Sequence, residues 1–322
     1  LPTTAPTAPP ATAAPPPTAP PAAPTAAVTP TVDAAGLLAS AEELARQGNF
    51  EGAVEQYTLA LEAAPQNADA YFGRGMAYFE LQQYPPAIAD FTEALRLDPQ
   101  RADAYHQRAR AKLRSDDPKG AIADFTEALR INPDDPVSYM RRGVAREADG
   151  DIEGALADYA EALRLRPDYA EAYYNRALTR QVAGDTEGAL ADFGEALRVK
   201  PDYLDSYLGR GLLLIAQGEY QRAVEDCAQV VALDPDRPDG YRCRVRAYRG
   251  LRNNRAALAD LNTLVELAPN DADVLAERGD VRQALGDTAG ALEDYRRAAA
   301  IYEQGGDTEK LRQVQQRIDA LE

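Results

Sequence analysis

The sequence has few of the side chains that build metal centres, disulfide frameworks and active sites. It contains two cysteines, Cys227 and Cys243, and a single histidine, His106, in 322 residues. Two cysteines are too few for a disulfide scaffold, and no Cys/His spacing fits a zinc site. No sequence motif around His106 would hold a nucleophile or a carboxylate next to its imidazole. We therefore expect a protein that is not an enzyme and uses neither a metal nor a cofactor.

Long apolar runs and positive charge are also scarce. No apolar run approaches the roughly 20 residues of a membrane helix, so we expect no direct insertion into a membrane. The formal net charge is −17, which argues against affinity for nucleic acid or anionic membranes, because most of the surface would repel phosphate. The chain starts at Leu1 rather than Met, and we expect a processed or trimmed sequence that has lost an upstream signal or anchor.

Proline, alanine and threonine dominate the N-terminus. Residues 1–31 contain 11 Pro, 10 Ala and 8 Thr, and the first charged residue is Asp33. Frequent proline removes backbone donors and disrupts helix, so the sequence predicts an extended, polyproline-II-like tail over residues 1–33. A spacer is the simplest interpretation. A stalk carrying O-linked sugar and a docking strand for another chain are the alternatives.

A strict period of 34 residues follows the tail. We number each repeat by slots 1 to 34, so that the repeats begin at residues 34, 68, 102, 136, 170, 204, 238 and 272. Slot 32 is proline in the first seven repeats: Pro65, Pro99, Pro133, Pro167, Pro201, Pro235 and Pro269. Slot 20 is alanine in all eight: Ala53, Ala87, Ala121, Ala155, Ala189, Ala223, Ala257 and Ala291. A fixed period of this length indicates stacked repeats.

Each repeat is predicted to contain two helices. Helix A covers roughly slots 2 to 14, a turn with glycine or a polar residue lies near slot 15, and helix B runs to about slot 30, where the proline stops it. The eighth repeat has Glu303 in slot 32, and its second helix is expected to continue. We assign residues 34–305 to eight repeats and residues 306–322 to a polar C-terminal capping helix.

This pattern closely resembles the tetratricopeptide repeat family. The resemblance implies an all-α, right-handed solenoid of eight helix-turn-helix repeats. It also implies that helix A residues line a concave groove, and that the groove binds polypeptides.

Two charged slots predict a structural ion pair in each repeat after the first. Slot 7 is arginine in Arg74, Arg108, Arg142, Arg176, Arg210, Arg244 and Arg278. Slot 23 is aspartate in Asp90, Asp124, Asp158, Asp192, Asp226, Asp260 and Asp294. Repeat 1 lacks both, carrying Ser40 and Gln56. Because the two residue types occur together and are absent together, we interpret them as pairs that join helix A to helix B.

By the same resemblance, slots 5, 9 and 12 of helix A face the groove. Repeats 2 to 6 place mostly apolar side chains there: Phe72, Met76, Phe79, His106, Met140, Val144, Tyr174, Leu178, Leu208, Leu212 and Ile215. Repeat 7 instead places Arg242, Arg246 and Arg249 there. We predict a peptide-binding groove that is apolar over repeats 2 to 6 and has an arginine anchor at repeat 7. The alternative is that these side chains only add to the packing between helices and bind no ligand. A nucleic-acid site would need a basic surface along the whole path.

The two cysteines lie on neighbouring predicted helices. Cys227 is on helix B of repeat 6 and Cys243 on helix A of repeat 7, at similar heights about the turn near Pro235. The sequence favours two buried free thiols, and a disulfide remains the alternative in an exported protein.

We interpret the protein as a scaffold that binds an extended polypeptide in the groove, outside the cytoplasm or on a cell surface. The alternative is a self-assembling filament protein, in which the tail of one copy occupies the groove of the next.

Overall fold

The computed structural model describes residues 33–322, which form seventeen α-helices and no strand. The predicted tail lies outside this range, except for Asp33. None of the helices in this range is both long and apolar enough to cross a bilayer.

Sixteen helices form eight A/B pairs with the predicted period. The helices A are α1 (Ala34–Arg46), α3 (Ala68–Glu80), α5 (Ala102–Arg114), α7 (Pro136–Ala148), α9 (Ala170–Val182), α11 (Leu204–Ala216), α13 (Pro238–Gly250) and α15 (Ala272–Ala284). The helices B are α2 (Phe50–Ala63), α4 (Tyr84–Leu97), α6 (Pro118–Ile131), α8 (Ile152–Leu165), α10 (Thr186–Val199), α12 (Tyr220–Leu233), α14 (Asn254–Leu267) and α16 (Thr288–Gly305). Helix A therefore spans slots 1 to 13, one residue earlier than expected.

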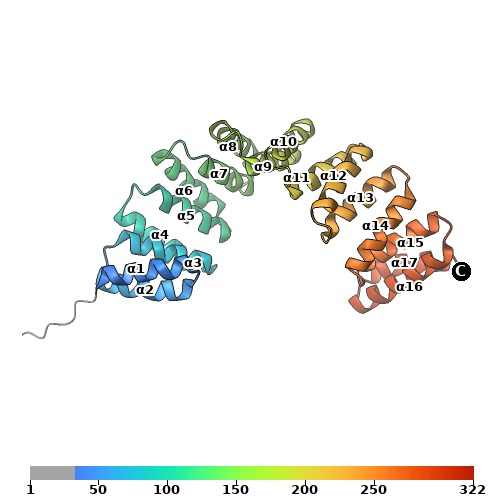
Figure 1. Ribbon diagram of the computed structural model, residues 1–322, viewed down its shortest axis with the longest axis horizontal. Helices are drawn as coiled ribbons and strands as arrows, with labels where there is room; N and C mark the ends of the chain where they lie inside the picture. Colours follow the sequence, from blue (N-terminus) through green and yellow to red (C-terminus); the bar gives the residue numbers. More distant parts are fainter. Residues whose placement is uncertain (1–32) are drawn as a thin grey trace, which may run out of the picture.

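Each helix packs against the next one in sequence, and the pairs stack into an arch with α1 and α17 near its two ends (Figure 1). The prediction of an all-α solenoid is confirmed. The eighth helix B also continues past slot 32 as expected, because α16 ends only where Gly306 adopts a left-handed conformation. Helix α17 (Thr308–Asp319) packs on α16 and buries Val314 and Ile318.

The turn between helix A and helix B has one conformation in all eight repeats. The slot 15 residue has a positive φ everywhere, and it is glycine in five repeats. Gln82, Asp116 and Arg252 adopt the same conformation in repeats 2, 3 and 7, with φ of 57° to 60°. Because left-handed backbone is costly for residues with a Cβ, the repeated geometry must be imposed by the packing of the two flanking helices.

Small and aromatic residues fill the core of each repeat. All eight slot 20 alanines are fully buried, which lets the helices approach closely. Slot 24 carries a buried aromatic ring in six repeats: Tyr57, Phe91, Phe125, Tyr159, Phe193 and Tyr295. Repeat 6 has Cys227 at this slot, and its side chain is also fully buried.

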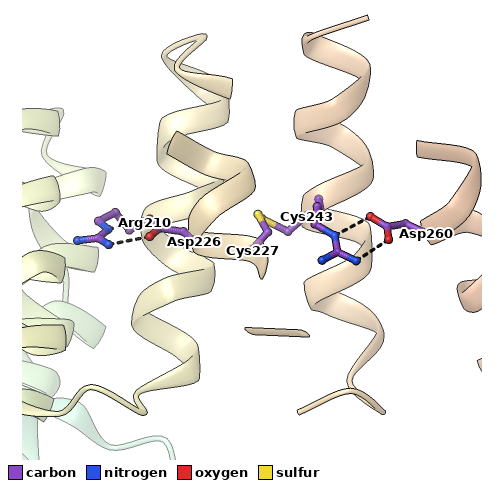
Figure 2. The surroundings of a disulfide bond; sticks show 6 residues. Arg210, Asp226, Cys227, Cys243 and Asp260 are labelled. Atoms are coloured by element: carbon purple, nitrogen blue, oxygen red, sulfur yellow. Dashed lines mark hydrogen bonds and ion pairs between the residues drawn. A yellow bond between two sulfur atoms is a disulfide. The ribbon is translucent and has the colours of Figure 1, made fainter. Parts of the chain in front are cut away.

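A disulfide between Cys227 and Cys243 replaces the ring in repeat 6. It joins α12 to α13, with the two Cα atoms 5.7 Å apart, and lies between the ion pairs of repeats 6 and 7 (Figure 2). The structure thus has the bridge, whereas the sequence favoured free thiols. Helix α13 also lies unusually close to α12, because a Cβ at Gly240 would overlap with Val230 and a Cβ at Gly250 with Tyr220.

Candidate functional site

The slot 7 arginines and slot 23 aspartates meet in all seven repeats that carry them. In each pair, Nε and Nη2 of the arginine donate to the two carboxylate oxygens over 2.6 to 2.9 Å. All seven aspartates are buried. The bidentate hydrogen bonds raise the pKa of Arg74, Arg210 and Arg244 above its ordinary value. These charges are therefore turned inward and do not belong to a ligand site.

Four of these aspartates have a second cation, which the sequence analysis missed. Slot 11 is Lys112, Arg146, Arg180 or Arg282 in repeats 3, 4, 5 and 8, and each lies 2.7 to 3.3 Å from the buried aspartate. In repeats 2, 6 and 7 the slot holds Tyr78, Leu214 and Tyr248 instead. Slot 11 holds a cation in four repeats and leucine or tyrosine in the other four, and this difference was the available signal. The repeats thus contain either one or two cations per buried aspartate.

The slot 7 arginines of repeats 2, 3 and 4 also link neighbouring repeats. Nη1 of Arg74 donates to the hydroxyl of Thr58 over 3.1 Å, and Arg108 and Arg142 do the same to Thr92 and Thr126. Each threonine lies on helix B of the preceding repeat. One guanidinium therefore links three helices in repeats 2, 3 and 4.

Most of the predicted groove residues on the helices A are partly exposed. Phe72, Met76, Phe79, His106, Val144, Tyr174, Leu178, Leu208 and Ile215 are half-buried, and Leu212 is exposed. Met140 differs from the prediction, because it is fully buried and packs against Tyr159 and its neighbours in repeats 4 and 5. Met140 is therefore a core residue and contributes no surface for a ligand.

Among the helices A of the described residues, only α9 and α11 carry large apolar side chains that are exposed. Val182 at the end of α9 is 71% exposed, although its slot was not considered in the sequence analysis. Leu212 on α11 is 37% exposed. Leu178 and Ile215 lie on the same two helices and are partly exposed. Exposed and partly exposed apolar side chains thus occur on two successive helices A, just before the arginines of repeat 7.

Two of the three arginines predicted to anchor a ligand are already paired. Arg242 contacts Asp271 over 2.5 Å, and Arg249 contacts Glu277 over 2.7 Å. Asp271 directly precedes α15, and Glu277 lies on α15 in repeat 8. The pattern within a single repeat does not predict that these carboxylates reach the arginines of repeat 7. Arg246 is exposed and makes no ion pair with any residue in the range 33–322. Of the three arginines predicted to anchor a ligand, Arg246 is therefore the one that has no carboxylate partner among the described residues.

His106 lies in a small apolar pocket of about 280 Å³ between repeats 3 and 4. Its Nδ1 is 2.7 Å from the hydroxyl of the buried Ser138, and its ring meets Phe125 edge to face. Burial lowers the pKa of His106 to about 4, an effect that Asp135 opposes and Arg110 assists. The imidazole is neutral near pH 7 and is held as part of the packing.

We predict that this histidine destabilises the protein in mild acid. The unfolded imidazole, with a pKa near 6.5, binds a proton before the folded one does, so stability is complete above pH 6.5 and falls toward pH 4. The lowered pKa corresponds to a loss of about 3 kcal/mol in the free energy of unfolding when the pH falls from above 6.5 to below 4. His106→Gln should remove this part of the pH dependence in urea unfolding. The imidazole C2 proton gives a single signal, and a shift of that signal between pH 8 and 5.5 would contradict the prediction.

Comparisons with known proteins agree with this architecture. A tetratricopeptide repeat family model matches residues 38–102, 174–238 and 244–306, and two further models of such repeats match residues 148–181 and 102–135. No curated protein gives a significant match to the chain.

Several solved structures share the fold at low sequence identity. One is the C-terminal part of a TPR repeat-containing protein from Cytophaga hutchinsonii, with a TM-score of 0.62 and 16% identity, over 74% of this chain and 98% of that one. Another is PilW, described as a type IV pilus biogenesis factor, with a TM-score of 0.58 and 23% identity, over 64% of this chain and 96% of that one. PilF from Pseudomonas aeruginosa has a TM-score of 0.56 and 20% identity, over 66% and 97%. At these identities the likeness concerns the fold alone. The family models, the 34-residue period and the stacked helix pairs together place this chain in the tetratricopeptide repeat family.

Proposed function

We propose that the protein binds an extended polypeptide along the concave face formed by its helices A. The observation that supports this most strongly is the open apolar surface of repeats 5 and 6, where Val182 and Leu212 are exposed beside partly exposed neighbours. Contiguous exposed apolar surface is typical of a binding site. Nothing in the chain's own described residues covers it.

The spacing of the helices defines the kind of ligand. Packed helices lie about 8–10 Å apart, and an extended chain advances about 3.3 Å per residue. A bound peptide would therefore meet a new helix A about every third residue, with apolar side chains at that interval. An acidic group of the ligand would fit beside Arg246, the predicted anchor arginine that has no carboxylate partner among the described residues.

The disulfide supports a location outside the cytoplasm. Disulfides persist in oxidising compartments and are rare where glutathione keeps thiols reduced. The bond between Cys227 and Cys243 is buried in the interface of two repeats. We propose that the protein is exported or displayed on the cell surface. The proposed glycosylation concerns threonines that lie outside the described residues.

A pair of matched leucines tests the binding surface. Leu212 on helix A and Leu267 on helix B are both 37% exposed, so replacing either by serine removes the same apolar group at the same exposure. Peptides selected from a random dodecapeptide display library against the full chain serve as ligands. We expect Leu212→Ser to weaken their binding about tenfold or more, since a buried leucine contributes about 1.5–3 kcal/mol.

Leu267→Ser should leave binding and helicity unchanged, because its side chain lies on helix B. Fluorescence anisotropy with labelled peptides measures both affinities. Equal effects of the two substitutions, or none from Leu212→Ser, would contradict the proposed location of the site.

A further inference from the structure

A second concave site lies at the opposite end of the array, between repeats 1 and 2. This N-terminal pocket has a volume of about 490 Å³, and its apolar wall consists of Phe50, Tyr57, Phe72 and Met76. Phe50 and Tyr57 come from α2, and Phe72 and Met76 from α3. Three aromatic rings and a methionine thus surround one cavity. Aromatic-lined grooves of this kind bind polyproline II segments, because the flat rings pack against proline.

The Tyr57 hydroxyl provides an unused hydrogen-bond donor in this wall. Three repeats have tyrosine at slot 24, and the hydroxyls of the other two are engaged: Tyr159 donates to Glu147 over 3.2 Å and Tyr295 to Asp280 over 2.8 Å. The hydroxyl of Tyr57 makes no hydrogen bond with any residue from 33 to 322. Gly73 leaves room beside it, since a Cβ there would overlap the Tyr57 hydroxyl. A proline-rich chain offers carbonyl oxygens that such a donor can bind.

The charges around the pocket disfavour an anionic ligand, because its two arginines are paired and three carboxylates, Glu42, Asp69 and Glu80, also line it. Arg101 stacks 4.0 Å above the Phe72 ring, and it is already paired with Asp69 and Asp103. Arg46 is paired with Glu43. These cations therefore have little charge left for a ligand, while the chain as a whole is strongly acidic.

The chain itself carries an uncharged proline-rich segment immediately before the pocket. Residues 15–21 read PPPTAPP, within a stretch that has no charged residue before Asp33. Helix α1 begins at Ala34 and contributes Glu42, Ala45 and Arg46 to the pocket, roughly 15–20 Å along its axis. At about 3.1 Å per residue, six or seven extended residues cover that distance. The eleven residues between residue 21 and Asp33 are more than sufficient.

From the pocket and its position we infer that residues 15–21 bind in the N-terminal pocket of their own chain. The occupant is thus a neutral, proline-rich strand that packs on the aromatic rings and accepts a hydrogen bond from Tyr57. A short tether gives the segment an effective concentration of about millimolar at its own pocket, far above the usual concentration of a second copy. The segment covers the repeat 1–2 end of the concave face and leaves repeats 5 and 6 open.

The two methionines of the chain provide a direct test. Met76 lies in the pocket, whereas Met140 is fully buried in repeat 4. The full chain is prepared with ¹³C-methyl methionine and with a nitroxide on Thr12→Cys, close to PPPTAPP. We expect the nitroxide to broaden the Met76 methyl signal and to leave the Met140 signal sharp, to the same extent at every protein concentration.

Two substitutions on equivalent tyrosines control this experiment. Tyr57→Phe should reduce the broadening of Met76, because it removes the free hydroxyl. Tyr159→Phe, at the same slot of repeat 4, should not change it. Equal signals for Met76 and Met140, or insensitivity to Tyr57→Phe, would overturn the inference.

A mixture distinguishes binding within one chain from binding between copies. Chains with ¹³C-methyl methionine but no nitroxide are mixed with unlabelled chains that carry the nitroxide. We expect no broadening of Met76 in this sample. Broadening here, growing with concentration, would replace the intramolecular contact by the filament arrangement. The outcome is independent of the leucine experiment at repeats 5 and 6, so either proposal can fail alone.

Discussion

Asp158→Ala should lower the free energy of unfolding by about 3–4 kcal/mol, because it leaves two partly buried arginines without their carboxylate. Asp158 is held by Arg142 at 2.7 Å and by Arg146 at 3.3 Å. We infer that these pairs are structural, since the aspartate is buried and the guanidinium lies between helices A and B. Urea unfolding followed by circular dichroism measures the change.

Asp90→Ala is the matched control for the second cation. Asp90 is equally buried, but it pairs with Arg74 alone, because slot 11 of repeat 2 is Tyr78. We expect a smaller loss for Asp90→Ala, by about 1 kcal/mol. Wild-type midpoints for both variants would show that the pairs do not stabilise the fold. Asp158→Asn keeps the shape of the side chain and one hydrogen-bond acceptor. Its free energy of unfolding should therefore lie between those of the wild type and Asp158→Ala.

Removing the disulfide should cost about 3 kcal/mol. The bond closes a loop with a sequence separation of 16 residues, and constraining a loop of this size in the unfolded chain is worth about that amount. The double variant Cys227→Ala/Cys243→Ala tests the effect in urea unfolding. Oxidised and reduced wild-type protein give the matched comparison without any substitution. If both unfold at the same urea concentration, the prediction is contradicted.

Alkylation and intact mass establish the bond itself. Unfolded protein that has not been reduced should take up no iodoacetamide, and the same protein after reduction should take up two equivalents. Because both sulfurs are buried in the folded protein, reduction should be slow until the repeats open. Two alkylated thiols without reduction would mean that the bond is absent.

The repeat period predicts most of the fold, because each repeat contacts mainly its neighbours and every slot has the same surroundings. Proline at slot 32 and alanine at slot 20 locate the helices to within about one residue. The spacing of slots 7 and 23 brings Arg142 to Asp158 for the same reason. These features depend on one repeat and are therefore visible in the sequence.

The candidate site is less predictable, since its surface depends on differences between repeats. Met140 shares a slot with the half-buried Phe72, yet the side chains of repeats 4 and 5 cover it completely. The pairing of Arg249 with Glu277 depends on how far repeat 8 rotates relative to repeat 7. The period does not contain that rotation, so the sequence alone overestimated the arginine anchor.

The disulfide also has a mechanical consequence. An array of eight repeats has seven interfaces between neighbouring repeats. Because each repeat contacts mainly its neighbours, the bending of the whole array is the sum of the bending at these interfaces. The covalent bond between α12 and α13, with the close approach at Gly240, makes one of the seven stiff. Bending then falls on the other six. In the proposed binding mode, the curvature over repeats 1 to 6 would adapt to ligands of different bulk, while Arg246 would keep a fixed distance from the apolar residues of repeat 6.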